Sequence, residues 1–303
     1  MTDQVIVDGN NIGRKHNDAV KLSSNGIPTQ AIIGCIKTAR ELIIRDPEAK
    51  HTWLWDGKAQ WRYDIHPGYK AKRNEPDPRR DASRASFNTQ RPIIWKGLSL
   101  IGVGQMTAKF HEADDLAGIM VRAAKKLNPA ALLKLISGDG DWIQLVMDGV
   151  TVRDISDDAK FYTLANLMEK VGYRTPYGFL EGKCLMGDGS DDIPGVGGIG
   201  EKGAPEFIAE FGSVREFWRQ CREGEFKPKK KAHINLASAA GQAAFARNLK
   251  IMQLISPHKP AAGEVTYDRG TYDREGFKAF CEEHNFLSIL KGFNDFVAPF
   301  ENK

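Results

Sequence analysis

Short apolar runs alternate with longer amphipathic segments through the first half of this 303-residue chain. The apolar runs are typical of buried strands and lie at residues 5–7, 52–55, 98–103, 132–136 and 150–152. Segments 29–45, 112–126 and 158–170 instead repeat their apolar residues at helical spacing. Strand alternating with helix predicts an α/β fold with a parallel sheet. In such a sheet the carboxyl ends of the strands share one edge, where functional sites gather.

The second half of the chain has a different texture. A glycine-rich stretch at 187–203 precedes helical segments near 204–221 and 238–255, with one further candidate strand at 264–267. We therefore expect an α/β core over residues 1–171 and a mainly helical region over 172–303. Residues 66–92 are polar, are interrupted by prolines and have no apolar stripe. They predict an exposed, mobile insertion in the core.

Charge is distributed unevenly along the chain. Residues 58–91 hold nine Lys and Arg against four acids, and residues 215–231 hold seven against three, so the remainder is acidic despite a net charge of +4. This segregation is typical of a protein that binds a polyanion and keeps an acidic pocket. The four cysteines form no metal-binding pair, no apolar stretch approaches the roughly 20 residues of a membrane helix, and the first residues contain no secretion signal. We expect a cytoplasmic protein with reduced thiols and no membrane partner.

Acidic residues gather at the ends of predicted strands, at one helix start and in the glycine-rich turn. Asp8 follows the first strand, Asp56 the second, and Asp139 and Asp141 the run at 132–136. Glu112, Asp114 and Asp115 lie at the helix start, and Asp188 and Asp191 lie in the turn. Each motif alone is also typical of a turn or a helix start. Together, so many carboxylates repel one another unless a cation neutralises them, and all-oxygen ligands suit Mg²⁺ or Mn²⁺. Two such ions about 4 Å apart can clamp a phosphodiester, so the pattern favours phosphoryl chemistry.

Two further motifs indicate nucleic-acid binding. GVGGIGEKG spaces Gly195, Gly197, Gly198 and Gly200 for a tight hairpin entering a helix, where backbone amides can hold a phosphate and Lys202 adds a charge. A plain glycine-rich linker is the alternative. Arg62, Tyr69, Lys70, Lys72 and Arg73 combine cations with an aromatic ring. We interpret them as a gate for single-stranded ends, with Tyr69 available for base stacking, against the alternative of a solvated charged loop.

In their order and amino-acid sequence these motifs resemble those of the 5′-nuclease (flap endonuclease) superfamily, in particular podovirus 5′→3′ exonucleases and the 5′-nuclease domain of bacterial DNA polymerase I. The resemblance covers roughly residues 4–255 and rests on VDGNN, WDG, EADDLA, SGDGDW and GDGSDDIPGVGGIGEK. It implies a PIN-like α/β core with a helical arch inserted at 62–92 and a helix–three-turn–helix at 187–203. It also implies that the nine acids named above bind metal or lie just behind the ligands, and that Lys70 and Arg73 steer the scissile phosphate. Asp192 stands where the family usually has Asn, which leaves open whether Asp191 or Asp192 faces a metal.

The expected activity is therefore that of a monomeric 5′→3′ exonuclease and flap endonuclease that uses two Mg²⁺ ions, with K⁺ at the glycine hairpin. Its expected partners are DNA with 5′ ends, nicks, gaps or flaps, and RNA in RNA–DNA hybrids, in the host cytoplasm if the protein is phage-encoded. Two alternatives stay open. A PIN-type ribonuclease is disfavoured by the hairpin and the arch, and a non-catalytic DNA-structure-binding protein is disfavoured by the intact acidic motifs.

Overall fold

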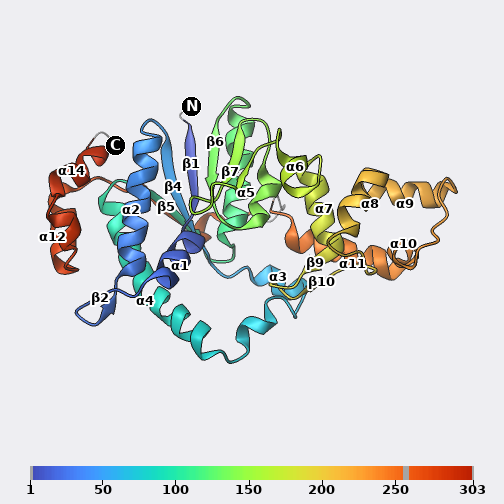
Figure 1. Ribbon diagram of the computed structural model, residues 1–303, viewed down its shortest axis with the longest axis horizontal. Helices are drawn as coiled ribbons and strands as arrows, with labels where there is room; N and C mark the ends of the chain where they lie inside the picture. Colours follow the sequence, from blue (N-terminus) through green and yellow to red (C-terminus); the bar gives the residue numbers. More distant parts are fainter. Residues whose placement is uncertain (1–2, 255–258, 302–303) are drawn as a thin grey trace.

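The computed structural model describes residues 3–254 and 259–301 and is built around a central twisted sheet (Figure 1). Five neighbouring strands are parallel, in the order β5 (Gly104–Ala108), β4 (Lys50–Trp55), β1 (Gln4–Asp8), β6 (Leu133–Ile136) and β7 (Val150–Arg153). Short antiparallel strands flank them, β11 (Val265–Asp268) beside β5 and β8 (Phe161–Tyr162) beside β7. The predicted parallel α/β sheet is confirmed.

Helices cover both faces of this sheet, because successive strand residues point to opposite sides. Val5, Val7 and Trp53 pack on one side with α1 (Gly9–Ala19), α2 (Gln30–Arg45) and α4 (Pro78–Leu100). Ile6 and Leu54 pack on the other side with α5 (Ala113–Leu127). In the register of the sheet, Val7 lies beside both Trp53 and Ile136. The carboxyl ends of β1, β4 and β6 are therefore level, and the residues after them share one edge.

A helical arm projects from the sheet, on the right of Figure 1. It contains α7 (Pro176–Met186), α8 (Gly203–Phe211), α9 (Val214–Glu223), α10 (Lys231–Ala237) and α11 (Ala239–Met252) around a separate apolar cluster. A two-stranded ribbon of β9 (Gly187–Asp188) and β10 (Ile193–Pro194) lies between α7 and α8. The short helices α3 (Gln60–Ile65) and α6 (Leu167–Val171) lie between this arm and the α/β core.

The insertion at 66–92 differs from its prediction. After a single 3-10 turn (Ala71–Asn74), the chain enters the 23-residue helix α4 at Pro78, with the Asp77 carboxylate accepting hydrogen bonds from the Arg79 and Arg80 amides at 3.0 Å each. Phe87 and Gln90 are buried against α1 and α2, where the Gln90 amide donates to Asn17 Oδ1 at 2.9 Å. From α3 through α4 the chain describes an arc beneath the sheet (Figure 1). The polar pattern of 66–92 predicted only an exposed, mobile insertion, and the helix from residue 78 onward agrees instead with the helical arch that the resemblance implied. The helix is docked through polar side chains and leaves no long apolar stripe in the sequence.

Two predicted elements are wrong. Residues 98–103 end α4 and turn into β5, which begins at Gly104, because a short buried apolar run does not separate a helix end from a strand. Residues 158–170 form strand β8, a turn and most of the short helix α6 in place of one long helix, since Phe161 is 40% exposed and anchors no helix.

The last segment of the chain returns to the α/β core. β11 pairs with β5, and α12 (Arg274–Glu283), α13 (Leu287–Leu290) and α14 (Phe293–Val297) come after it. Phe280 of α12 is buried beside Gly97 of α4, Phe277 is buried in the same apolar cluster, and Trp95 Nε1 donates to Asp268 Oδ2 at 3.0 Å. The segment from β11 to α14 is thus mainly helical, as expected for this part of the chain, but it packs on the α/β core, with α12 against α4.

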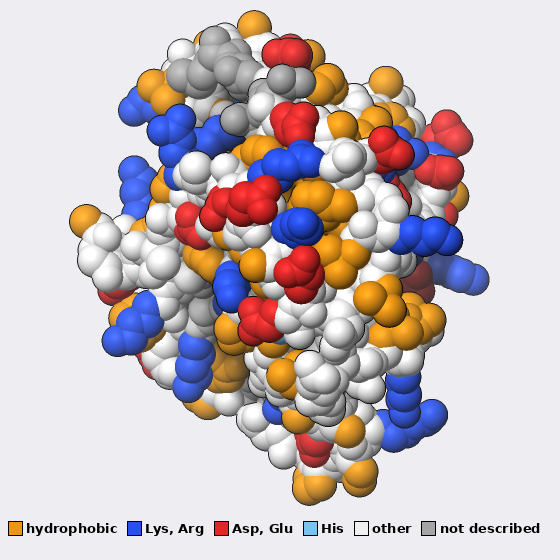
Figure 2. All heavy atoms as spheres, turned by 90° about the vertical axis from the view of Figure 1, so that its left-hand side faces the viewer, with side chains coloured by type: hydrophobic (Ala, Val, Ile, Leu, Met, Phe, Trp, Pro, Cys, Tyr) orange, Lys and Arg blue, Asp and Glu red, His pale blue; other side chains and the backbone are white. Residues whose placement is uncertain are grey.

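The face that carries α12 and α14 is turned toward the viewer in Figure 2, where acidic and basic side chains are intermixed. Lys96 pairs there with Glu283 at 3.3 Å, and Arg274 with Glu301 at 2.5 Å. Among the described residues, no helix combines the length and apolar character that crossing a membrane would require.

Candidate active site

The end of β1 places the first carboxylate. Asp8 is the N-cap of α1, where its Oδ1 accepts from the Asn11 amide at 2.9 Å and its Oδ2 accepts from the Ser137 hydroxyl at 2.7 Å. Ser137 Oγ also accepts from the Asp139 amide at 3.0 Å, and the Asn11 side-chain oxygen accepts from the Gly138 amide at 3.0 Å. The loop after β6 is thus fastened to the end of β1, which brings Asp139 toward Asp8.

Asp56 fastens β4 to two helices. Its Oδ1 accepts from the Ala113 amide at the start of α5 at 2.9 Å, and its Oδ2 accepts from the Asn10 side-chain amide at 2.5 Å. On α5, Asp114 Oδ1 accepts from the Trp142 indole at 2.7 Å, which ties the helix start to the Asp139–Asp141 loop. The parallel strands and these hydrogen bonds together bring the acids to the same edge of the sheet.

The result is a cleft of about 180 Å³ at the carboxyl ends of the parallel strands. Eight of the nine predicted acids line it, namely Asp8, Asp56, Glu112, Asp114, Asp139, Asp141, Asp188 and Asp191. The cleft also contains Lys70 and Arg73, both predicted, and Asn10, Asn11, Arg14 and Ser190, which sequence reasoning missed.

Five carboxylates of the cleft have raised pKa values. Burial, reinforced by the nearby Asp56 charge, raises the pKa of Asp8 to about 7. Burial and the charges of Asp139, Asp8 and other neighbours raise the pKa of Asp114 well above its ordinary value. Burial is also the main reason that the pKa values of Asp56, Asp141 and Asp191 are raised. A divalent cation would relieve this repulsion, so an oxygen-only donor set of this kind fits a hard metal ion.

Amino and guanidinium groups now partly neutralise the cleft. Within the described chain, no three acidic, His or Cys side chains already enclose a point where an ion would sit. Lys70 Nζ instead lies 2.6 Å from Glu112 Oε1 and 3.7 Å from Asp191 Oδ2, and Arg73 pairs with Asp191 Oδ1 at 2.6 Å. Although burial opposes it, the charges of Lys70 and Arg62 hold the pKa of Glu112 below its usual range.

Lys183 is a member of this network that the sequence did not reveal. From α7, its Nζ bridges Asp141 Oδ1 and Asp188 Oδ2, the latter at 3.2 Å. Lys183 lies in a largely apolar helix, GFLEGKCLM, so charge patterning gave no signal. Its spacing of five residues before Asp188 is the only local feature that could have found it.

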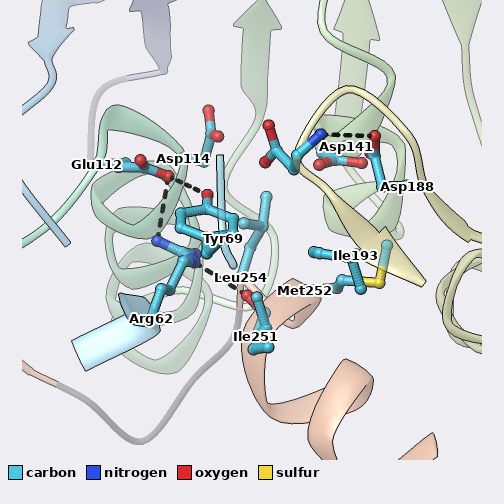
Figure 3. Close-up of a pocket in the computed structure, with 11 residues that line it drawn as sticks. Arg62, Tyr69, Glu112, Asp114, Asp141, Asp188, Ile193, Ile251, Met252 and Leu254 are labelled. Atoms are coloured by element: carbon cyan, nitrogen blue, oxygen red, sulfur yellow. Dashed lines mark hydrogen bonds and ion pairs between the residues drawn. The ribbon is translucent and has the colours of Figure 1, made fainter. Parts of the chain in front are cut away.

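Arg62 and Tyr69 line a small pocket of their own behind Glu112, which also reaches Asp114, Asp141 and Asp188 (Figure 3). Neither they nor Asp115 line the larger acidic cleft, so Asp115 lies behind the possible ligands. Arg62 is 2% exposed and its guanidinium binds both Asp115 oxygens at 2.7 and 2.6 Å and the Ile251 carbonyl at 2.9 Å. Tyr69 is also 2% exposed, and its hydroxyl donates to Glu112 Oε2 at 3.1 Å. Both side chains bind Glu112 from behind, so the predicted DNA contact by Arg62 and base stacking by Tyr69 would require them to leave these partners. Asp115 is occupied by Arg62 and serves as the buried counter-charge.

Replacing Arg62 tests this support. We expect Arg62→Ala to lower the free energy of unfolding by about 3–5 kcal/mol, because it leaves the Asp115 charge buried and unpaired. Urea denaturation followed by circular dichroism measures the change. Arg79→Ala, which removes an exposed arginine on α4, is the matched control. Equal midpoints for the two variants would contradict the buried ion pair.

The structure also separates Asp191 from Asp192. Asp191 lines the cleft, whereas Asp192 adopts a left-handed backbone (φ 56°) and turns outward. Its carboxylate accepts from the Lys72 amide at 2.9 Å and pairs with Lys72 Nζ at 3.0 Å, and its carbonyl is 3.0 Å from His66 Nε2. Asp192 therefore connects the turn to the base of the arch.

The glycine hairpin lies apart from the acidic cleft, between α7 and α8. None of Gly195, Gly197, Gly198, Gly200 and Lys202 lines the cleft. Val196 and Ile199 are buried in the arm and anchor the loop, while Gly197 and Gly198 have φ of 70° and 83°, which glycine adopts without strain. Gly198, Gly200 and Lys202 are exposed. Their role in DNA binding stays a prediction.

Comparison with known proteins assigns the chain to a family. Residues 3–172 match the model for the 5′-3′ exonuclease N-terminal resolvase-like domain, and residues 174–268 match the model for the 5′-3′ exonuclease C-terminal SAM fold. The chain belongs to the 5′-3′ exonuclease family, whose members are phosphodiester hydrolases.

Curated relatives include DNA polymerase I of Bacillus subtilis, 29% identical over 98% of this chain and 33% of the relative, and thermostable DNA polymerase I of Thermus aquaticus, 29% identical over 97% and 33%. The chain thus spans about a third of the length of these relatives. Two solved structures agree with the fold. One is bacteriophage T5 5′-exonuclease with bound zinc (25% identity, TM-score 0.70, covering 94% of this chain and 99% of that one). The other is the bacteriophage T5 flap endonuclease in a pseudo-enzyme–product complex with DNA and metal ions (25%, 0.69, 97% and 99%).

Proposed function

We propose that this protein is a Mg²⁺-dependent 5′→3′ DNA exonuclease with structure-specific flap endonuclease activity. The observation that carries the proposal is the cleft of eight carboxylates, several with raised pKa values, beside Lys70 and Arg73. A set of acids that ionises incompletely by itself is suited to binding two divalent ions, with Mn²⁺ as a substitute for Mg²⁺.

The acids form one electrostatically connected set. Asp8, Asp56, Glu112 and Asp139 all act on Asp114, and Asp139 also acts on Asp141. Asp188 acts on both Asp141 and Asp191, so the whole set is suited to share two neighbouring ions. Bound ions would polarise the phosphodiester and lower the pKa of an attacking water.

The cations of the cleft complete the site. Lys70 has a left-handed backbone (φ 54°), and its amide donates to the Asp191 carbonyl at 2.9 Å, so its side chain is held over Glu112. Once metal ions neutralise Glu112 and Asp191, the Lys70 ammonium and the Arg73 guanidinium are free to bind the scissile phosphate and stabilise its developing charge.

DNA would reach this site from the arm. The exposed glycines of the hairpin, Gly195, Gly198 and Gly200, with Lys202 and a K⁺ ion, are suited to the duplex backbone. The arc from α3 to α4 is suited to the single strand. The proposed substrates are DNA with 5′ ends, nicks, gaps or flaps, and RNA in RNA–DNA hybrids. The proposed working form is a cytoplasmic monomer.

End-labelled substrates test the proposal. Blunt, nicked, gapped and 5′-flapped DNA, a hybrid duplex and single-stranded RNA are incubated with Mg²⁺ or with EDTA, and the products are resolved on denaturing gels. We expect short 5′ products from DNA with Mg²⁺ alone. Cleavage of RNA but no DNA would support the ribonuclease instead, and binding without any product would reduce the protein to a DNA-structure binder.

A further inference from the structure

Charge pairing in the cleft leaves one arginine without an acidic partner. Lys70, Arg73 and Lys183 are each held by carboxylates. Arg14, on α1, also lines the cleft and is exposed, yet it forms no ion pair within residues 3–254 and 259–301. Its guanidinium is therefore available to an incoming anion before any metal binds.

Asp56, a carboxylate of the cleft on which Arg14 acts electrostatically, is bound by other donors. One of its oxygens accepts from the Ala113 amide and the other from the Asn10 side chain. Among the described residues, the Arg14 guanidinium has no hydrogen bond or ion pair, although it lines the same cleft as eight acids.

Arg14 is held in place by an aromatic platform. Its guanidinium carbon lies 5.3 Å from the ring centre of Phe87, a buried residue of α4. The ring packs directly on α1 because residue 13 is glycine; a Cβ there would meet a Phe87 ring atom at 2.5 Å. A guanidinium stacked on an aromatic face keeps its in-plane N–H donors for an anion such as phosphate.

A second arginine adds positive charge to the side of the cleft that contains Arg14. Arg91 of α4 donates to the Asp56 carbonyl at 2.8 Å and lies 5.7 Å from the Trp55 ring centre. Burial, with a contribution from Arg14, lowers the pKa of Arg91, so the two charges are close enough to repel each other. An anion bound by both Arg14 and Arg91 would relieve that repulsion.

We propose that Arg14 binds a phosphate of the DNA strand on the α1 side of the metal centre, with Phe87 as its platform. The inference rests on the proposed nuclease function and adds a specific substrate contact to it. Arg14 lies about 9 Å along α1 from the cap residue Asp8, at the helical rise of about 1.5 Å per residue. The contacted phosphate is thus a neighbour of the scissile one and is either an internal diester or the 5′-terminal phosphate.

Steady-state cleavage of a nicked duplex with a 5′-phosphate or a 5′-hydroxyl at the nick tests the proposal. The proteins are wild type, Arg14→Ala, Arg14→Lys and the control Arg45→Ala, which removes an exposed arginine at the end of α2, outside the cleft. We expect Arg14→Ala to raise KM by about tenfold with little change in kcat, as for one lost charged contact, and Arg14→Lys to have a smaller effect. Equal losses on both substrates assign an internal phosphate, whereas a loss confined to the 5′-phosphorylated one assigns the terminal phosphate.

Binding in EDTA, measured by fluorescence anisotropy over a range of salt concentrations, is the independent readout. The slope of log K against log salt should fall by about one unit in Arg14→Ala and stay unchanged in Arg45→Ala. An unchanged KM on both substrates and an unchanged slope would overturn the proposal for Arg14. If wild type cleaves no DNA with Mg²⁺, the proposed function fails, and the salt slope still decides whether Arg14 binds phosphate.

Discussion

Asp114→Asn should reduce Mg²⁺-dependent cleavage by about 10³-fold, which corresponds to about 4 kcal/mol of transition-state stabilisation. Asp114 lies at the start of α5, is surrounded by four other acids and is oriented by the Trp142 indole. An amide keeps the oxygen that accepts this hydrogen bond but removes the charge. Single-turnover cleavage of a 5′-flap substrate measures the loss, and anisotropy in EDTA shows whether DNA binding persists.

The same substitution should stabilise the metal-free protein at alkaline pH. The pKa of Asp114 is raised well above its ordinary value in the folded state, so folding favours its protonated form. Its contribution to stability is present at acid pH and is lost as pH rises through the folded-state pKa. In EDTA we expect a higher Tm for Asp114→Asn than for wild type at pH 8 and little difference near pH 4.

Mg²⁺ should reverse this order, because an ion that binds only the folded state stabilises it in proportion to its affinity. At pH 8 the Tm of wild type should rise with Mg²⁺ concentration, and that of Asp114→Asn should rise less. A variant that is less stable than wild type in EDTA at pH 8, or that still cleaves within tenfold of wild type, would contradict a metal role for this carboxylate.

Lys70→Ala should lower kcat by about 10²–10³-fold, the range typical for losing one preorganised donor that stabilises transition-state charge. Lys70 is clamped between Glu112 and Asp191 at the rim of the cleft, and its backbone is fixed by the Asp191 carbonyl. The loss should appear in kcat more than in KM, because the ammonium is released to the phosphate only when metal ions neutralise its present partners.

Lys72→Ala provides the control for Lys70→Ala. Its side chain is 66% exposed and pairs with Asp192 outside the cleft. It removes the same charge two residues away, so a general electrostatic effect on DNA would reduce both variants alike. Equal kcat values for the two variants would show that Lys70 has no special role in the chemical step.

The sheet and the acidic cleft could be predicted from the sequence, because the determining signals are local. A buried strand that ends in Asp places that acid at a known edge, and the register of β1, β4 and β6 makes those edges level. Four of the eight acids in the cleft, Asp8, Asp56, Asp139 and Asp141, follow strands in this way. Glu112, Asp114, Asp188 and Asp191 were expected there from a helix start, a glycine-rich turn and the family resemblance.

Side-chain partners could not be predicted in the same way. Arg62 and Tyr69 stand in a basic, polar stretch that indicates an exposed loop, yet Arg62 meets Asp115 across 53 residues and both support Glu112 from within. The role of Lys183 could not be predicted either, because its partner Asp141 is 42 residues away in sequence. Burial of a charge depends on a counter-charge brought by tertiary packing, and no local pattern records it.

The order of α4 has a similar origin. Asn17, Gln30 and Gln90 dock the helix through a buried amide network instead of an apolar stripe. Polar side chains of this kind are typical of surface helices and loops, so the sequence alone favours an exposed insertion.

The pairing of β11 with β5 has a consequence for how the chain is made. The edge of β5, complete at residue 108, receives its partner only when residues 265–268 have been synthesised, and α12 then closes over the back of α4. Until that point the growing chain exposes an unpaired strand edge and the apolar surface that later receives Phe277 and Phe280. During synthesis, the sheet of the core is thus completed only after the helical arm at 176–252 has been made, although β5 precedes that arm in the sequence.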